Sequence, residues 1–123
     1  MKATINGVEF TLEVANKPDA LAKGLMFRNV VPNRTGMLFV FPEKSVQSMW
    51  MKNTFVGLDI LFCDDLTTSL SNELKILTIH KNAKPHDLTR ISSQVACKYA
   101  IELPAYSVAY YKIKPGQNVL LQK

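Results

Sequence analysis

The 123-residue chain lacks the features that mark several large classes of protein. Its longest purely apolar run is five residues, Met37 to Phe41, whereas a helix needs about 20 apolar residues to cross a bilayer. It has two cysteines, Cys63 and Cys97, which are too few for a disulfide scaffold and match no zinc-binding spacing. Polar residues soon after Lys2 interrupt any apolar segment of a secretory signal. We therefore expect a cytoplasmic protein that does not enter a membrane.

Sequence motifs of catalysis and cofactor binding are also missing. The chain has no nucleophile elbow and no glycine-rich loop that would cradle a phosphate. His80, His86 and Asp87 form the only histidine-centred group, and their spacing fits no metal pair on a helix. Asp64-Asp65 lacks the further oxygen ligands of a calcium loop and is better explained as a turn. We expect no cofactor and no metal site.

The composition is that of a globular domain. Hydrophobic residues make up 47% of the chain and charged residues 20%, and the length suits a single domain over residues 1–123. Fifteen Lys and Arg against ten Asp and Glu give a net charge of +5, with the densest basic stretch between Lys75 and Lys98. That stretch lacks interleaved aromatics on which bases would stack, so the charge does not favour nucleic acid as a partner.

The clearest local pattern is a β-hairpin at the start of the chain. Asn6-Gly7 is a preferred pair for a type I′ turn. Residues 8–14 then alternate between apolar and polar, as a half-buried strand requires. Pro18-Asp19 suits the first turn of a helix, and Leu21 and Leu25 are spaced for one buried face, so we expect a helix over residues 18–28.

The rest of the chain reads as short strands separated by turn signals. Residues 80–93 are polar and contain Pro85, which predicts a long loop, and Pro115-Gly116 fits a type II turn. Residues 105–111 are expected to form one helical turn or an irregular crossing. The expected strands cover residues 37–41 (stopped by Pro42), 46–51, 58–63, 74–79, 95–103 and 118–122. This organisation predicts a mainly β domain, a compact sandwich or barrel with one short helix near the N-terminus.

Several stretches, taken in order, resemble one known family. They are GLMFR at residues 24–28, GMLFVF at 36–41, MWMKNT at 49–54 with LDI at 58–60, ELPA at 102–105 and IKPG at 113–116. The family is the one known as domain of unknown function 192. The resemblance implies a compact, mostly β fold with a short helix near the N-terminus, and it implies no activity.

The chain also departs from the pattern of that family. Gly57 stands where the family usually has proline, Tyr106 where it has glycine, and Gln117 where it has aspartate. Family members often begin with an export signal, which is not seen in this sequence.

The MWMKNT stretch is the strongest candidate for a binding site. In a strand, Trp50, Lys52 and Thr54 would share one face, where an indole, an ammonium and a hydroxyl suit a small polar ligand. Asn53 belongs to the same stretch, and Arg28 would add a fork for an anion. The first hypothesis is therefore a small-ligand-binding or accessory module. In the alternative, Trp50 and the methionines fill the core and the chain is a structural or interaction protein with no small ligand.

Asp59 supports a second hypothesis. It lies between Leu58 and Ile60, where a carboxylate must be paired or hydrogen-bonded. With Lys52 or Glu102 it would make an acid–base pair of a small enzyme. The alternative is a structural acceptor for Lys52, Arg28 or backbone donors.

Sulfur ligands for a cuprous ion are a further option. Such a set would draw on Met26, Met37, Met49, Met51 and Cys63. Irregular core packing explains the methionines equally well, and Cys97 alternates with apolar neighbours as a core thiol does. The sequence predicts no particular ligand and no oligomeric state.

Overall fold

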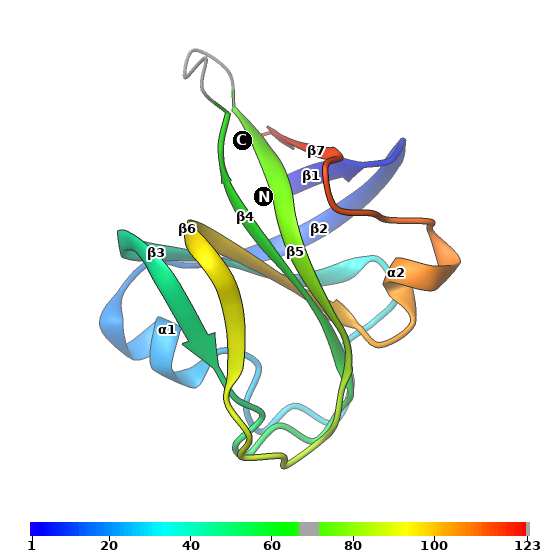
Figure 1. Cartoon of the computed structure of the whole chain (residues 1–123). Coiled ribbons are helices and arrows are strands. Elements are labelled where there is room, and N and C mark those ends of the chain that lie inside the picture. The colour runs from blue at the N-terminus through cyan, green and yellow to red at the C-terminus, as the bar shows by residue number, and fades with distance from the viewer. Residues whose placement is uncertain (67–71, 123) are drawn as a thin grey trace.

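The computed structural model describes residues 1–66 and 72–122, which fold as seven strands and two short helices (Figure 1). The strands are β1 (Lys2–Ile5), β2 (Val8–Ala15), β3 (Thr35–Met49), β4 (Leu58–Asp65), β5 (Glu73–Ala83), β6 (Ile91–Pro104) and β7 (Asn118–Gln122). The helices are α1 (Pro18–Lys23) and α2 (Ser107–Tyr110). The mainly β class with a short N-terminal helix is confirmed. No helix in the described ranges has the length and hydrophobicity that crossing a membrane requires.

The strands form one sheet that closes in a ring. Their order is β1-β2-β3-β6-β4-β5-β7, and β7 also pairs with β1. All neighbours run antiparallel except β2 and β3, which are parallel. A parallel pair needs a crossover connection, and residues 16–34 supply it. This crossover carries α1 and places the helix beside β3 (Figure 1).

The first hairpin and the last turn form as predicted. Asn6 and Gly7 have φ angles of 49° and 77°, which are the positive values of a type I′ turn between β1 and β2. Gly116 has a φ of 92°, and Gln117 donates its backbone N–H to the Lys114 carbonyl oxygen at 3.3 Å. Both turns therefore use the glycine where a left-handed conformation is needed.

Two hydrophobic cores lie on opposite sides of the central strands. One takes residues from all seven strands, including Leu61 and Ile101. The other includes Phe39 and Ile60. Because successive residues of a strand point to opposite faces, the neighbours Ile60 and Leu61 belong to different cores. β4 is therefore buried along its length until Asp65.

β3 is one long strand where the sequence predicted two. Pro42 does not end it, because the proline lies in an irregular stretch where the register with β6 shifts between Val40 and Ser45. A proline is tolerated there, since an irregularity in the ladder removes the need for its missing N–H. β3 continues to Met49 and brings that end beside the start of β6.

Two further boundaries differ from the prediction. The polar segment 80–93 is a loop only over residues 84–90, because β5 extends to Ala83 and β6 begins at Ile91. Asp64-Asp65 lies in β4 and is not a turn. Polar side chains at these strand ends are compatible with backbone pairing, which does not depend on the side chain.

α1 begins at Pro18 as predicted but ends at Lys23, five residues early. Gly24 follows with a φ of 50°, and its N–H donates to the Ala20 carbonyl oxygen at 2.9 Å. Glycine adopts this left-handed conformation without strain and so ends the helix. A Cβ at Gly24 would also lie 3.1 Å from the ring of Phe39. The chain therefore turns back sharply over β3.

Gly36 fixes the position of β6. A Cβ at this position would lie 2.0 Å from the backbone oxygen of Glu102, so no other residue permits this approach. The close contact between Gly36 in β3 and Glu102 in β6 sets the place of the Glu102 backbone in the middle of the sheet.

Candidate functional site

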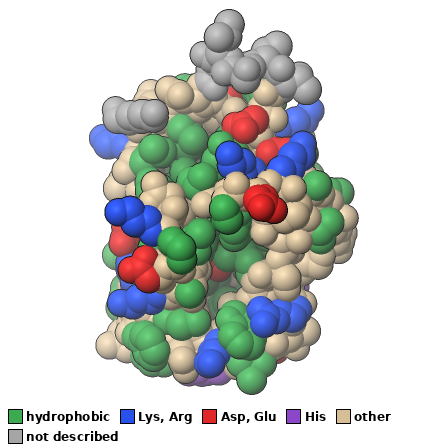
Figure 2. Space-filling model, turned by 90° about the vertical axis from the view of Figure 1, so that its left-hand side faces the viewer, with side chains coloured by type: hydrophobic (Ala, Val, Ile, Leu, Met, Phe, Trp, Pro, Cys, Tyr) green, Lys and Arg blue, Asp and Glu red, His purple; other side chains and the backbone are tan. Residues whose placement is uncertain are grey.

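A pocket beside α1 is the candidate functional site. Its volume is about 200 Å³. The face that carries α1 is hollowed, with hydrophobic side chains along the hollow and Lys or Arg side chains at its margins (Figure 2). We call this site the Glu102 pocket, and its lining consists of residues 21–26, Phe39, residues 48–50, Thr54, Arg90 and Glu102.

Glu102 is the acidic residue of the pocket. It lies in β6 between Met37 of β3 and Ile60 of β4, and it is only 4% exposed. Burial raises the pKa of the Glu102 carboxyl from 4.5 to about 8, because loss of water disfavours the charged form. At neutral pH the group is therefore mostly protonated and reaches the pocket without charge.

Glu102 differs from the other buried polar side chains. Six polar or charged residues are buried in the described part of the chain, and five of them have a hydrogen-bond or ion-pair partner there. Glu102 has none within those ranges. The five partnered residues are Thr54, Asp59, Asp64, Ser93 and Ser107. No fully buried side-chain nitrogen or oxygen atom in the described residues lacks a partner, so the Glu102 carboxyl is accessible from the pocket and not sealed in the core. A carboxyl that lines a pocket and has no protein partner is a feature of a binding site.

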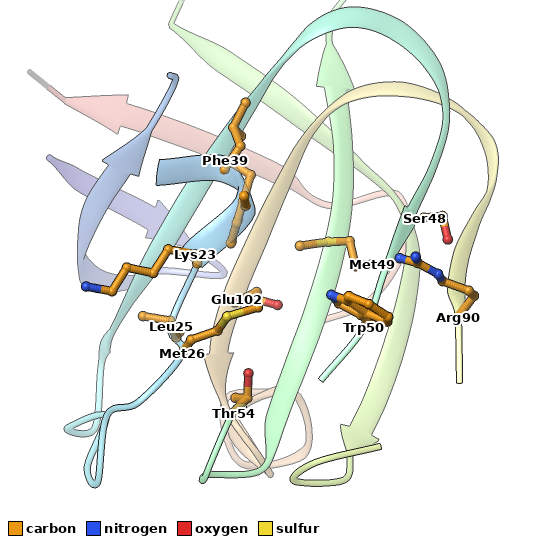
Figure 3. A pocket seen from close by; sticks show the side chains of 13 residues that line it. Lys23, Leu25, Met26, Phe39, Ser48, Met49, Trp50, Thr54, Arg90 and Glu102 are labelled. Carbon is orange, nitrogen blue, oxygen red and sulfur yellow. The ribbon is translucent and has the colours of Figure 1, made fainter. Parts of the chain in front are cut away.

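Trp50 forms one wall of the pocket. The indole is half-buried, and the guanidinium carbon of Arg90 lies 4.0 Å from the ring centroid. The Lys52 ammonium is 5.3 Å from the same centroid, so two cations accompany the ring. In Figure 3 the nitrogen end of the ring points toward Glu102, and Arg90 lies beyond the ring. The structure thus places the Lys52 ammonium over the Trp50 ring.

The segment after β3 is a turn and not a strand. Thr54 donates its N–H to the Met51 carbonyl oxygen at 3.1 Å, and Asn53 has a φ of 53°. The prediction that Trp50, Lys52 and Thr54 share one strand face is therefore wrong. Instead Lys52 is exposed, while Thr54 is 4% exposed and lines the pocket. The Thr54 hydroxyl donates to the Lys52 carbonyl oxygen at 3.1 Å.

Arg28 and Asn53 lie outside the pocket lining. The Arg28 guanidinium pairs with the Glu13 carboxylate, with one of its two contacts at 2.9 Å. This pairing lowers the pKa of Glu13 and raises that of Arg28. Arg28 lines a different hollow, of about 520 Å³. Asn53 contributes its backbone oxygen, which accepts from the Phe27 N–H at 2.8 Å.

Asp59 is fully buried, and both of its carboxylate oxygens accept hydrogen bonds. One carboxylate oxygen accepts from the Asn82 N–H and the other from the Val108 N–H, both at 2.9 Å. Glu102 pairs with Ile60, so it points to the opposite face of the sheet from Asp59. The structure therefore does not bring Asp59 together with Glu102, and the exposed Lys52 lies at Trp50 instead.

The sulfur atoms considered for a cuprous ion lie in three places. Met26 and Met49 line the Glu102 pocket. Met37 and Met51 are buried in the core beneath α1, and Cys63 lies in the other core. The five side chains therefore do not form one site.

Sequence reasoning missed the roles of Arg90 and Glu102 in one pocket. Glu102 stands between Ile101 and Leu103, and an acidic residue between two apolar ones is the same signal that drew attention to Asp59. Arg90 carries no such signal. It reaches Trp50 because the start of β6 pairs with the end of β3, where Met49 faces Ile91.

Comparison with known proteins identifies relatives over nearly the whole chain. A solved structure from Sinorhizobium meliloti 1021, described as a "putative transcription regulator", is 35% identical with a TM-score of 0.86, and covers 96% of this chain and 90% of its own. A protein of unknown function from Novosphingobium aromaticivorans DSM 12444 is 30% identical with a TM-score of 0.85, and covers 98% of this chain and 84% of its own. No curated protein sequence matches.

The family comparison agrees with the sequence motifs. Residues 1–121 match the family described as "Uncharacterized ACR", domain of unknown function 192. The match includes every described strand and both helices except the last residue of β7. The chain therefore belongs to the domain of unknown function 192 family.

Proposed function

We propose that the protein is a small-ligand-binding module and that the Glu102 pocket is its binding site. The observation that carries the proposal is the Glu102 carboxyl, which is 4% exposed, lines the pocket and has no hydrogen-bond partner in the described ranges. The carboxyl is accessible from the pocket and is not used by the described residues, so it is available to a hydrogen-bond donor or a cation of a ligand.

The remaining lining supports the same function. Small-molecule sites are mostly apolar with a few polar groups that fix orientation. Here Leu25, Met26 and Phe39 supply apolar surface, while Thr54 and Glu102 supply polar groups. A ligand can contact the indole only if the ring is partly accessible, and Trp50 is half-buried in the wall of the pocket.

The name of the Sinorhizobium relative speaks of transcription regulation. A ligand-binding module is compatible with that description, because regulators respond to small molecules. We leave nucleic acid outside the proposal, since Arg90 in the basic stretch is already stacked on Trp50.

The experiment is a binding screen with Trp50 as the probe. Trp50 is the only tryptophan, so its indole N–H gives one signal in a ¹⁵N–¹H spectrum that is sensitive to weak ligands. The panel contains small amines, sugars and polyols, and carboxylic acids, each tested also by thermal unfolding. At least one class is expected to shift the signal and raise the Tm.

A matched pair of variants locates the site. Thr54→Val removes a hydroxyl from the pocket and is expected to weaken binding. Thr4→Val makes the same change on β1, away from the pocket, and is expected to leave binding unchanged. The proposal is overturned if no class in the panel moves the Trp50 signal, or if both variants bind as the wild type does.

A further inference from the structure

Within residues 1–66 and 72–122, no cationic side chain pairs with the Glu102 carboxyl. Among the described lining residues, the cationic side chains are those of Lys23 and Arg90. The Lys23 ammonium points away from Glu102, and Arg90 lies beyond the Trp50 ring (Figure 3). An ionised carboxylate buried in this way is costly unless a cation pairs with it. A ligand that brings its own cation would meet that requirement.

A second acceptor lies beside the carboxyl. The Thr54 hydroxyl points into the space next to Glu102 (Figure 3). Its hydrogen is donated to the Lys52 carbonyl oxygen, so its lone pairs remain for a donor from the ligand. An ammonium group has three N–H donors and suits a site where acceptors converge.

The remaining wall fits a short carbon chain. Leu25, Met26, Phe39 and Met49 present apolar surface around the carboxyl. A volume of about 200 Å³ suits a compact molecule. A metal ion fits less well, because no group of three His, Cys, Asp or Glu side chains comes together within residues 1–66 and 72–122.

From these observations we infer that the Glu102 pocket binds a small aliphatic ammonium compound, with its ammonium group on Glu102 and Thr54 and its carbon chain against Met26 and Phe39. The inference rests on the proposed function, since it names the class of ligand for the same pocket.

Binding of this class has a characteristic pH dependence. An ammonium ligand requires the ionised carboxyl, so it displaces one proton from Glu102, whose pKa burial raises to about 8. Affinity is therefore expected to increase about tenfold per pH unit from pH 6 toward pH 8 and to level off above it. Lys23 and Arg90 are the other charged groups of the described lining.

The experiment compares three ligands that have the same carbon chain. n-Butylammonium, n-butanol and butyrate are titrated into the full chain at pH 6, 7 and 8, with the Trp50 N–H signal as the readout. The variant Glu102→Gln keeps the shape of the side chain without its charge, and Glu43→Gln makes the same change at an exposed position of β3. n-Butylammonium is expected to bind at least tenfold more tightly than n-butanol at pH 8, and Glu102→Gln alone is expected to abolish that preference.

Failure of the inference is distinguishable from failure of the proposed function. If n-butanol or a sugar from the screen binds and Glu102→Gln leaves the affinity unchanged, the pocket is a binding site but the inference on its ligand class is wrong. If no member of either panel binds, the proposed function itself is wrong. If n-butylammonium binds and Glu102→Gln leaves both its affinity and its preference over n-butanol unchanged, Glu102 is not its partner and the inference is overturned.

Discussion

The Asp59 carboxylate accepts a hydrogen bond of 2.9 Å from the backbone N–H of Val108, at the start of α2. The first N–H groups of a helix have no partner within the helix, and an acidic side chain satisfies them well. The second carboxylate oxygen accepts from Asn82, which has a φ of 56° near the end of β5. Asp59 thus connects β4 to β5 and to α2, which explains a carboxylate between two core residues.

Replacement of Asp59 tests this structural role. Asp59→Asn puts an NH₂ group against one of the two backbone N–H donors, which leaves that donor buried without an acceptor. The free energy of unfolding is expected to fall by about 2–3 kcal/mol, as measured by urea denaturation. Asp65→Asn, at the exposed end of β4, is the control and is expected to cost less than about 1 kcal/mol. Equal stability of the two variants would contradict the assignment.

The raised pKa of the Glu102 carboxyl predicts that the stability of the protein decreases as the pH rises. The folded-state pKa is raised to about 8, so the folded protein binds a proton that the unfolded chain has already released above pH 4.5. Its contribution is therefore complete below about pH 4.5 and is lost as the pH rises toward 8. Because of this pKa difference between the folded and unfolded states, the free energy of unfolding is expected to be about 4–5 kcal/mol lower well above pH 8 than below pH 4.5.

Glu102→Gln removes this dependence. The variant is expected to match the wild type near pH 5 and to be the more stable protein at pH 9, since the amide does not ionise. Urea denaturation of both proteins at pH 5, 7 and 9 measures the difference in their free energies of unfolding. A constant difference between the two proteins across this range would show that Glu102 is not held protonated by burial.

Much of the fold could be predicted from local patterns. The Asn6-Gly7 hairpin, the Pro115-Gly116 turn and the strand 118–122 depend on residues close in sequence, so local rules were sufficient. The helix end was missed because Gly24 ends α1, although the apolar spacing continues to Leu25. The missing N–H of Pro42 is visible in the sequence and predicts a strand end, while the register shift that accommodates the proline is not visible there.

The candidate site was predicted only in part, for a related reason. Trp50, Lys52 and Thr54 were selected from one contiguous stretch, and Trp50 and Thr54 do line the pocket. The pocket also needs Arg90 and Glu102, which come from β6 and from the residue before it. Their approach to Trp50 depends on the pairing of β3 with β6, and that pairing spans about half the chain. Local patterns carry no information on such a contact.

The stacking of Arg90 on Trp50 predicts a spectroscopic effect. Arg90→Ala removes the guanidinium 4.0 Å from the ring centroid and is expected to change the fluorescence of Trp50. The cost in the free energy of unfolding is expected to be about 0.5–1 kcal/mol, as for an exposed cation–π contact. Lys84→Ala, in the same loop, is the control and is expected to leave the fluorescence unchanged. If both variants have the wild-type spectrum, the stacking does not persist in solution.

Loss of the ion pair between Arg28 and Glu13 is expected to lower stability without affecting ligand binding. Its pairing lowers the pKa of Glu13, so the contribution of the pair is present above about pH 4.5 and is lost as the pH falls below it. Both side chains are substantially exposed, so Arg28→Gln is expected to cost no more than about 1 kcal/mol at pH 7. Ligands of the Glu102 pocket are expected to bind this variant as they bind the wild type. If the variant no longer binds these ligands, Arg28 contributes to the binding site.

The two thiols are expected to be inert in the folded protein. Cys63 and Cys97 are both fully buried, and burial raises the pKa of each thiol, which lowers the fraction of reactive thiolate. They belong to different cores, Cys63 to the one inside the ring of strands and Cys97 to the one beneath α1, and both are free thiols. A thiol reagent such as dithionitrobenzoate is expected to label neither residue in buffer and both in 6 M guanidinium chloride. Rapid labelling of one thiol in buffer would show that its core opens readily, and Cys63→Ser and Cys97→Ser would identify which core it is.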